Sequence, residues 1–415
     1  MNACIVAVGS ELLTPLRMDT NSLRITERLN EVGFSVRHKA VVGDNLDDLV
    51  RAFESLLPTV DLLVCTGGLG PTDDDLTRDA IARVTRRPLE FHDDIFERIR
   101  ERFARRNLTM PEINRRQAMV PRGAEVLPNR HGTAPGLWLE HEGTPIVVLP
   151  GPPREMIPML EAVIAERLTD RSGGARLYRR TLRITGRTES DVDSVAQPVY
   201  GPWRSGSIPV ETTILAVLGQ IELHLSATAA DRASADAVLD PAVGALKAAL
   251  GPSVYSTDGR PLEAVVGDLL RAAAWTIAAA ESCTGGLLTS RLTDVPGSSD
   301  YVEASAVCYS NRAKVEWLGV DPRLIEGHGA VSEPVARAMA EKIKARAHTN
   351  VGVGITGIAG PGGGTPEKPV GTVAIAVATP DATSVRTYQF IGGREQVKFQ
   401  ATQAAMNMLR LMMLP

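Results

Sequence analysis

The strongest constraint on the fold is a repeated alternation of short apolar runs with amphipathic helical patterns, joined by glycine-rich turns. Residues 3–9 read ACIVAVG, a buried-strand pattern, and residues 46–57 then place Leu46, Leu49 and Phe53 at helical spacing. Apolar side chains at such spacing share one face of a helix. Strands that alternate with helices predict a parallel or mixed sheet with both faces covered.

The alternation occurs twice, on either side of a segment of different character. Residues 1–170 and 258–415 alternate strand and helix patterns, whereas residues 171–257 carry strand patterns around a stretch rich in proline, glycine and serine. We therefore predict two three-layer α/β domains joined by a small α+β module. The module carries no catalytic constellation, so we expect it to serve as a spacer or a dimer contact.

The charge balance argues against a strongly basic surface. The 415 residues include 45 Lys and Arg against 49 Asp and Glu, a net charge of −4. Such a balance gives no field that would attract nucleic acid or an anionic membrane. The four cysteines form no CxxC pair, no secretory signal precedes the first strand, and no apolar run approaches the roughly 20 residues that span a bilayer. We expect a cytoplasmic protein that handles small molecules and binds neither nucleic acid nor membrane directly.

Residues 66–77, TGGLGPTDDDLT, lie between a predicted strand and a predicted helix. Glycines allow the backbone to approach a ligand closely, and the amides at a helix N-terminus attract anions. The sequence therefore predicts an anion-binding turn. Its candidate substrate-binding residues are Gly67, Gly68, Gly70 and Thr77.

Three aspartates in the same turn, Asp73, Asp74 and Asp75, suggest a divalent cation that bridges carboxylate and phosphate, as Mg²⁺ does. Asp44, at the end of another predicted strand, could supply a further ligand. The alternative is that the acids stabilise the helix N-terminus, which is worth only about 0.3–1 kcal/mol each. Because one capping aspartate would suffice for that, we favour the metal–phosphate site.

Residues 94–106, DIFERIRERFARR, predict a helix that carries five arginines. The arginines could bind phosphate, but the interspersed Glu97 and Glu101 favour a solvated helix with ion pairs along its surface. Two proline/glycine loops, HGTAPG at 131–136 and LPGPPREM at 149–156, could line the same cleft. Taken alone, these loops are equally compatible with structural turns.

Residues 281–286, ESCTGG, end a predicted strand and place Ser282 at a strand-to-helix turn. A hydroxyl there is exposed, and the nearby backbone amides of the turn, which continues into Gly285 and Gly286, could hold an oxyanion. Cys283 is the rival nucleophile, but no histidine lies near it in sequence. The residues thus indicate a nucleophile whose base has to come from elsewhere.

The candidate base is Lys314 in YSNRAK, a segment that begins with Tyr309. A lysine base must be uncharged, so its pKa has to fall from about 10.4 to about 7–8, at a cost of roughly 4 kcal/mol. A capping serine and a surface lysine are the equally weighted alternative. The loop 354–364, GITGIAGPGGG, ends a strand near Thr356 and suits a phosphate or an oxyanion, or is a surface loop.

With these motifs, the chain resembles the CinA family of competence/damage-inducible proteins over nearly its whole length. VGSELL, VVGDN, TGGLGPTDDDLT, HGTAPG and LPGPPREM resemble its N-terminal molybdopterin-binding-type domain, which is akin to MoaB and MogA. AESCTGG, RLTDVPGSS, YSNRAK, HGAVSEP, ITGIAGP and KPVGTV resemble its C-terminal amidase domain.

The resemblance implies two activities in one pyridine-nucleotide recycling hydrolase. Residues 1–170 would be a pyrophosphatase that uses a divalent metal, Mg²⁺ or Co²⁺, to split ADP-ribose into AMP and ribose 5-phosphate. Residues 258–415 would deamidate nicotinamide mononucleotide (NMN) to nicotinic acid mononucleotide and ammonia without a cofactor. The resemblance also implies a homodimer.

Carried over by motif, the resemblance implies roles for particular residues of the C-terminal domain. Ser282 would be the nucleophile and Lys314 its base, with Tyr309 and Thr356 assisting. Arg394, in IGGRE, would contact the charged groups of the substrate. The glycines of the two turns would line the substrate site: Gly285, Gly286, Gly357 and Gly360.

In the N-terminal domain the resemblance implies metal ligands. Asp75 falls where the MogA-like proteins keep an aspartate, Asp74 belongs to the DD pair of the family, and Asp44 matches another aspartate. Asp73 stands at a variable position and is discounted.

The chain departs from the family pattern in two places, TPLRMDTNS after VGSELL and PVETTILAVLGQIEL in the middle module. Two rival functions stay open. One is a molybdopterin- or nucleotide-binding module without hydrolysis, which ADP-ribose binding without turnover would favour. The other is an interaction protein in DNA uptake or repair, which salt-dependent retention on DNA would favour.

Overall fold

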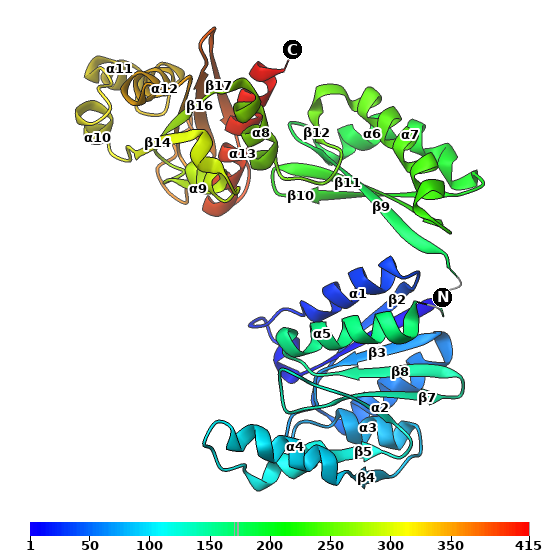
Figure 1. Cartoon of the computed structure of the whole chain (residues 1–415). Helices are drawn as coiled ribbons and strands as arrows, with labels where there is room; N and C mark the ends of the chain where they lie inside the picture. The colour runs from blue at the N-terminus through cyan, green and yellow to red at the C-terminus, as the bar shows by residue number, and fades with distance from the viewer. Residues whose placement is uncertain (170, 172–173, 415) are drawn as a thin grey trace. The chain divides into compact units, whose positions relative to one another are not determined.

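The structure is a computed structural model that describes residues 1–169, 171 and 174–414. It contains two compact units, residues 1–178 with 228–236 and residues 179–227 with 237–415. Both are built from mixed sheets and helices, which confirms the predicted α/β class (Figure 1). The predicted boundary after residue 170 falls on residues outside this description.

The first unit is organised around a six-stranded sheet with the order β2-β1-β3-β8-β7-β6. The first four strands of that order run parallel, and β7 and β6 add antiparallel pairs at one edge. A separate ribbon pairs β4 with β5. The strands are β1 (Asn2–Val8), β2 (Ser35–Val42), β3 (Leu62–Thr66), β4 (Leu89–Phe91), β5 (Met119–Pro121), β6 (Glu125–Leu127), β7 (Gly136–His141) and β8 (Thr144–Leu149).

Helices cover both faces of this sheet (Figure 1). Because successive side chains of a strand point to opposite faces, Cys4 and Val6 of β1 join a core with Phe53, whereas Ile5 joins a core with Ile25 on the other face. The face of Ile5 carries α1 (Asn21–Glu31) and α5 (Pro153–Val163). The face of Cys4 and Val6 carries α2 (Leu46–Leu56), α3 (Thr77–Val84) and α4 (Asp93–Ala104).

The middle part of the chain forms a four-stranded sheet with the order β10-β11-β9-β12. Strand β10 is not among the predicted strands, and its exposure explains why. Only Val210 of its eight residues is buried, so no strong apolar alternation marks it. The elements are β9 (Arg176–Ile184), α6 (Glu189–Tyr200), β10 (Val210–Val217), β11 (Gln220–Ala229), α7 (Arg232–Leu250) and β12 (Val254–Ser256).

The C-terminal part is a three-layer α/β domain around a five-stranded sheet with the order β14-β13-β15-β16-β17. Strand β13 lies between β14 and β15 and runs parallel to both, whereas β16 and β17 are antiparallel additions. The strands are β13 (Ile277–Glu281), β14 (Val302–Val307), β15 (Val351–Gly357), β16 (Thr372–Ala378) and β17 (Thr383–Gln389).

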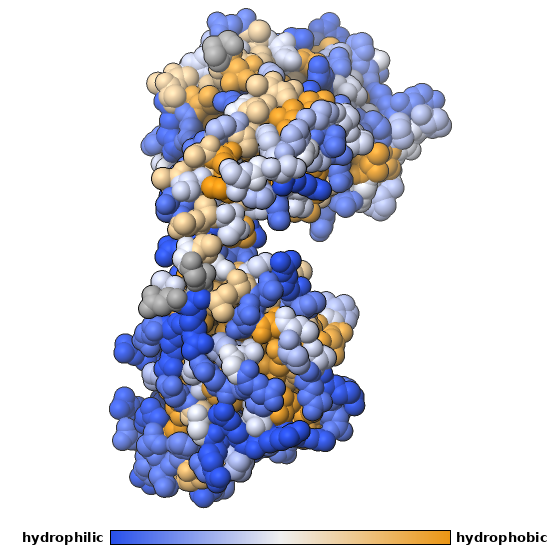
Figure 2. Space-filling view, turned by 90° about the vertical axis from the view of Figure 1, so that its right-hand side faces the viewer, coloured by the Kyte–Doolittle hydropathy of each residue, from blue (hydrophilic) through white to orange (hydrophobic). Residues whose placement is uncertain are grey.

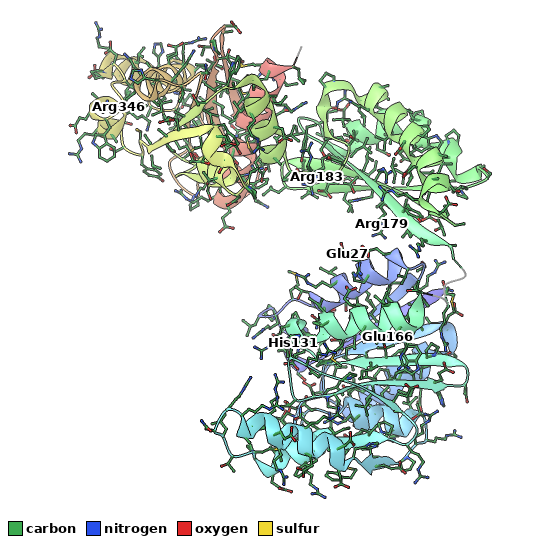
Figure 3. All side chains as sticks on the ribbon, in the orientation of Figure 1. Glu27, His131, Glu166, Arg179, Arg183 and Arg346 are labelled. Carbon is green, nitrogen blue, oxygen red and sulfur yellow. The ribbon has the colours of Figure 1, made fainter. Side chains whose placement is uncertain are left out.

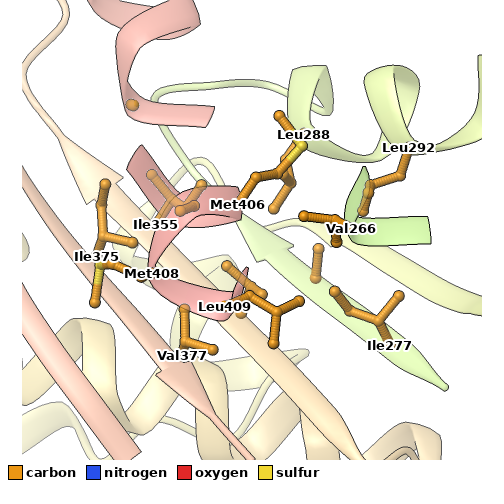
Figure 4. Close-up of a cluster of buried hydrophobic side chains, with 14 of the residues drawn as sticks. Val266, Ile277, Leu288, Leu292, Ile355, Ile375, Val377, Met406, Met408 and Leu409 are labelled. Atoms are coloured by element: carbon orange, nitrogen blue, oxygen red, sulfur yellow. The ribbon is translucent and has the colours of Figure 1, made fainter. Parts of the chain in front are cut away.

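One face of that sheet is covered by α8 (Leu262–Ala273), α9 (Leu287–Thr293) and α13 (Arg394–Met413). Figure 4 shows part of this core, where Val266, Leu288 and Met406 approach Ile277 and Ile355 of the sheet. The other face packs against α10 (Asn311–Glu316), α11 (Pro322–His328) and α12 (Glu333–Ala347). This sandwich fixes the strand ends from which the site described below is built.

The described helices include none that is long and apolar enough to cross a membrane. On the face that Figure 2 shows, hydrophilic residues cover most of the first unit, and apolar residues form smaller areas among them. The large apolar side chains lie mainly inside, in the cores described above.

Helix α12 packs directly on the backbone of β15 because β15 has glycine at its contact positions. A Cβ on Gly354 would lie 2.3 Å from the carbonyl oxygen of Ala336, and one on Gly352 would lie 2.1 Å from that of Ala340. Neither backbone oxygen can move without moving the helix, so a methyl group at either position has to push α12 off the sheet.

We predict that Gly354→Ala lowers the free energy of unfolding of this domain by about 1–3 kcal/mol, the usual cost of overpacking a core. Differential scanning calorimetry of the full chain measures the shift. Gly362→Ala is the matched control, because a Cβ there meets no atom within 4 Å. Equal melting temperatures for the two variants would contradict the packing described.

Candidate active site

The carboxyl ends of three neighbouring strands of the C-terminal sheet meet at one place. Ser282 follows β13 directly, Tyr309 lies two residues after β14, and Thr356 is the last residue but one of β15. Since β13 pairs in parallel with both neighbours, these ends lie at the same edge of the sheet. Ligands of α/β sheets bind at such edges.

Glu281 fixes the turn that carries Ser282. Its carboxylate is fully buried and accepts four hydrogen bonds, from the amides of Gly286 and Leu288 at 3.1 Å and from the amide and hydroxyl of Thr289 at 3.0 and 2.9 Å. An acidic side chain at a helix N-terminus satisfies amides that have no partner within the helix. Glu281 thereby locks the start of α9 against the end of β13.

The glycines of the turn are required by its shape. Gly285 and Gly286 have φ of 64° and 96°, in the left-handed region that favours glycine. The amide of Gly285 donates to the Ser282 carbonyl at 3.1 Å. At the end of β15, a Cβ on Gly357 would lie 3.0 Å from the sulfur of Cys283, so this strand end also lies close to the turn.

Lys314, from α10, reaches Ser282 across 32 residues of sequence. Its Nζ lies 3.0 Å from the Ser282 Oγ, 3.1 Å from the carbonyl oxygen of Cys308 and 3.3 Å from that of Tyr309. Both side chains are buried, with Lys314 2% and Ser282 6% exposed. The structure therefore brings together the hydroxyl and the amine that the sequence singled out.

Burial lowers the pKa of Lys314, because a desolvated ammonium is disfavoured relative to the neutral amine. The two carbonyl oxygens can only accept hydrogen bonds. A neutral amine can donate its two protons to them and direct its lone pair at the Ser282 hydroxyl, whereas an ammonium can donate to all three oxygens. The same geometry therefore accommodates Lys314 before and after it takes a proton from Ser282.

Cys283, the rival nucleophile, is buried, and its burial raises the pKa of the thiol to about 12. A thiolate is the reactive form of cysteine. At neutral pH Cys283 is therefore a neutral thiol that packs in the core of the domain.

The other predicted residues of this domain hold the segments around the pair. The Arg394 guanidinium donates to the hydroxyl of Tyr309 and to the carbonyl of Gly360, both at 2.7 Å. It thereby ties helix α13 to the segment after β14 and to the loop after β15. Thr356 is buried and donates to the carbonyl of Ala330 at 2.9 Å, so its hydroxyl holds a neighbouring loop rather than Ser282.

Two functional contributions were not predicted from the sequence. One is Glu281, whose position between a buried strand and a glycine turn was the available signal. The other is Lys368, whose Nζ donates to the carbonyls of His328 and Val331 at 2.8 and 2.7 Å. Lys368 thus fixes the loop that also receives Thr356. Lys368 begins the KPVGTV motif and the loop lies in HGAVSEP, but neither motif indicates that the two segments are in contact.

In the first unit, the TGGLG turn follows β3 as predicted. Gly67 and Gly68 have φ of 102° and 65°, and a Cβ on Gly67 would lie 2.2 Å from the Val8 carbonyl oxygen. The hydroxyl of Thr77 donates to the Gly67 carbonyl at 2.8 Å, and Arg78 donates to the carbonyls of Leu69 and Gly70 at 2.7 and 2.8 Å. These hydrogen bonds hold the turn, and the missing Cβ atoms of Gly67 and Gly68 make room for the Val8 carbonyl and the Thr77 hydroxyl.

The predicted metal ligands do not form a cluster in this arrangement. Asp75 accepts from the amides of Gly70 and Thr72 at 2.7 and 2.8 Å, so its two oxygens already bind the turn. Asp44 accepts from the amide of Ser10 at 2.7 Å, and Asp74 is exposed. Among the residues that the structure describes, no three His, Cys, Asp or Glu side chains are grouped so that they could hold a metal ion. A divalent metal therefore does not fit these carboxylates as they stand.

Three family models match the chain. Residues 4–170 match "Probable molybdopterin binding domain", residues 179–256 match "Damage-inducible protein CinA KH domain", and residues 259–413 match "CinA C-terminal domain".

The chain is also similar to whole proteins. A CinA-like protein of Koribacter versatilis is 45% identical over 414 residues, 99% of each chain. A CinA-like protein of Solibacter usitatus is 41% identical over 410 residues, 99% of this chain and 98% of its own. Among solved structures, the protein CinA from Thermoplasma acidophilum is 33% identical, with a TM-score of 0.38, and the match covers 40% of this chain and 98% of that one.

The lowered pKa of Lys314 predicts how stability depends on pH. Between the folded pKa and the ordinary 10.5, the unfolded chain holds a proton that the folded chain lacks, so stability rises with pH across that window. We predict that Lys314→Met removes this rise, so that the wild type gains stability relative to the variant as pH increases. Urea unfolding at a series of pH values measures it.

Lys342→Met, which alters an exposed lysine of α12, is the control and should follow the wild-type pH dependence. Parallel curves for wild type and Lys314→Met would show that Lys314 titrates alike in the folded and unfolded chain, and would contradict the desolvated amine.

Proposed function

The chain belongs to the CinA family, and from that premise we propose that its C-terminal domain hydrolyses the amide of NMN to give nicotinic acid mononucleotide and ammonia. The observation that carries the proposal is the 3.0 Å contact between the Lys314 Nζ and the Ser282 Oγ in a buried site. A serine hydroxyl is a weak nucleophile unless an adjacent base takes its proton, and a desolvated lysine is such a base.

The first half of the reaction forms an ester. The Ser282 Oγ attacks the carboxamide carbon while its proton passes to the Lys314 Nζ, and the carbonyl oxygen becomes an oxyanion. The Lys314 ammonium then donates that proton to the amide nitrogen, the C–N bond breaks, and ammonia leaves. The acyl group stays on Ser282. General acid–base catalysis of this kind accelerates a reaction on the order of 10²–10⁴-fold.

The second half returns the enzyme to its starting state. Water attacks the ester carbon, and the neutral amine of Lys314 takes the proton of that water. The tetrahedral intermediate collapses, Ser282 Oγ leaves and takes the proton back from Lys314, and the carboxylic acid is released. Every proton that Lys314 accepts is returned, so no cofactor is consumed.

The oxyanion is assigned to the amides of Cys283 and Thr284. The amides of Gly285 and Gly286 already donate within the turn, whereas those of Cys283 and Thr284 have no backbone or carboxylate acceptor among the described residues. The loss of one such donor costs on the order of 10²–10³ in kcat in other hydrolases. We propose that the guanidinium of Arg394, which lies beside Tyr309, binds the phosphate of the substrate.

Hydrolysis of ADP-ribose to AMP and ribose 5-phosphate by the N-terminal domain is the second candidate function. It is favoured by the position of the TGGLG turn, which lies between β3 and the N-terminus of α3, where backbone amides attract phosphate. Because the aspartates assemble no metal site in this arrangement, we derive no metal step.

We predict that Ser282→Ala and Lys314→Arg each reduce ammonia release from NMN by at least 10³-fold, because the first removes the nucleophile and the second leaves a cation that cannot act as a base at neutral pH. A coupled ammonia assay measures the rate. Ser290→Ala and Lys342→Arg are controls of the same chemistry outside the site and should retain wild-type turnover. Ammonia release by Ser282→Ala at the wild-type rate would refute the nucleophile.

For the second candidate, we predict that the full chain converts ADP-ribose to AMP and ribose 5-phosphate, with products read by chromatography in the absence and in the presence of added Mg²⁺ or Co²⁺. Asp75→Asn should reduce that turnover because its amide nitrogen cannot accept from the turn amides. Binding of ADP-ribose without products at any metal concentration would instead identify a nucleotide-binding module.

A further inference from the structure

The arginine-rich helix α4 faces a cavity in the first unit. The cavity measures about 270 Å³ and lies between α4 and the loop of residues 128–135 that connects β6 to β7. Figure 3 labels His131 on this loop. The charged side chains that line the cavity are Arg98, Glu101, Arg102, Arg105 and Arg130.

The four arginines of the cavity are not equivalent. Arg98 pairs with Asp94 at 2.8 Å and Arg105 with Glu101 at 3.5 Å, as the salt-bridged alternative for this helix predicts. In the part of the chain that the structure describes, no carboxylate pairs with Arg102 or Arg130. These two guanidinium groups therefore leave an uncompensated positive charge at the cavity.

Arg102 is also held in place. Its Nη1 donates to the carbonyl of Arg130 at 3.2 Å. This bond uses one of the five N–H donors of the guanidinium, and the other donors can bind a ligand. The tether joins α4 to the opposite wall of the cavity, so the two unpaired charges belong to one site.

The loop wall is pre-formed by two polar side chains. The Oδ1 of Asn129 accepts from the amides of His131 and Gly132 at 2.9 and 2.7 Å, and its Nδ2 donates to the buried Glu155 at 2.8 Å. A Cβ on Gly132 would lie 1.7 Å from the Glu155 carboxylate, so only glycine fits there. A ligand would not have to order this loop, which reduces the entropic cost of binding.

We propose that this cavity binds a small phosphate-bearing anion of the size of a sugar phosphate. Guanidinium groups match the geometry of phosphate oxygens and bind them with paired hydrogen bonds. The volume of about 270 Å³ lies just below the roughly 300–1,000 Å³ typical of small-molecule sites, so it accommodates a sugar phosphate or a pyrophosphate rather than a whole dinucleotide. The proposal does not rest on either proposed activity.

The test is titration of the full chain with ribose 5-phosphate and, separately, with inorganic pyrophosphate, followed by calorimetry. We expect the double variant Arg102→Ala/Arg130→Ala to weaken binding at least tenfold. Arg100→Ala, on the same helix but outside the cavity and paired with Glu97, should bind as the wild type does. All three proteins should retain the same rate of NMN deamidation.

Hydrogen–deuterium exchange locates the effect. The ligand should slow exchange in residues 128–135 of the wild type and of Arg100→Ala, but not in the double variant. Equal affinity in the double variant, protection confined to other segments, or no binding of either ligand by the wild type would each overturn the proposal.

Discussion

The site of the C-terminal domain depends on one buried amine. The Lys314 amine is buried and contacts two carbonyl oxygens and the hydroxyl of Ser282. This burial lowers the pKa of Lys314. Among the described residues, no carboxylate forms an ion pair with Lys314 that would hold the charge on the ammonium. Since the carbonyls accept from the amine in either protonation state, Lys314 can exchange a proton with Ser282 without a change of geometry.

The rest of the domain serves to hold that contact. Glu281 ties the start of α9 to the end of β13, which fixes the backbone on both sides of Ser282. Strand β14 lies beside β13, so the segment after β14 returns past the turn and brings Lys314 to it. Lys368 and Arg394 connect the surrounding loops through backbone carbonyls. Glu281 and the pairing of β13 with β14 thus position the pair, whereas Lys368 and Arg394 hold the loops around it.

Much of the fold was predictable because its core strands and helices carry regular patterns. The buried run at residues 3–9 and the helical spacing at 46–57 match β1 and α2 closely. Strand β10 and the short helix α10 were not predicted, since one is exposed and the other has only six residues. Such elements are determined by tertiary pairing more than by local pattern.

The site was predictable only in part. Glycine turns marked Ser282, but no sequence pattern states that β14 pairs with β13, and that pairing is what brings Lys314 to the turn. Lys314 was therefore a candidate that the family resemblance strengthened. For the aspartates of the first unit, the sequence predicted metal ligands that the structure does not bring together. Asp75 instead accepts hydrogen bonds from its own turn with both oxygens. The arginines of α4 divide between ion pairs and an open cavity, a distinction that only the structure supplies.

The most direct test of the serine–lysine chemistry is mass spectrometry of the protein quenched in acid during turnover of NMN. The peptide that contains Ser282 should carry the nicotinic acid mononucleotide acyl group as an ester on that residue. Turnover with this peptide unmodified at every time sampled, or with the group attached to Cys283, would contradict the account.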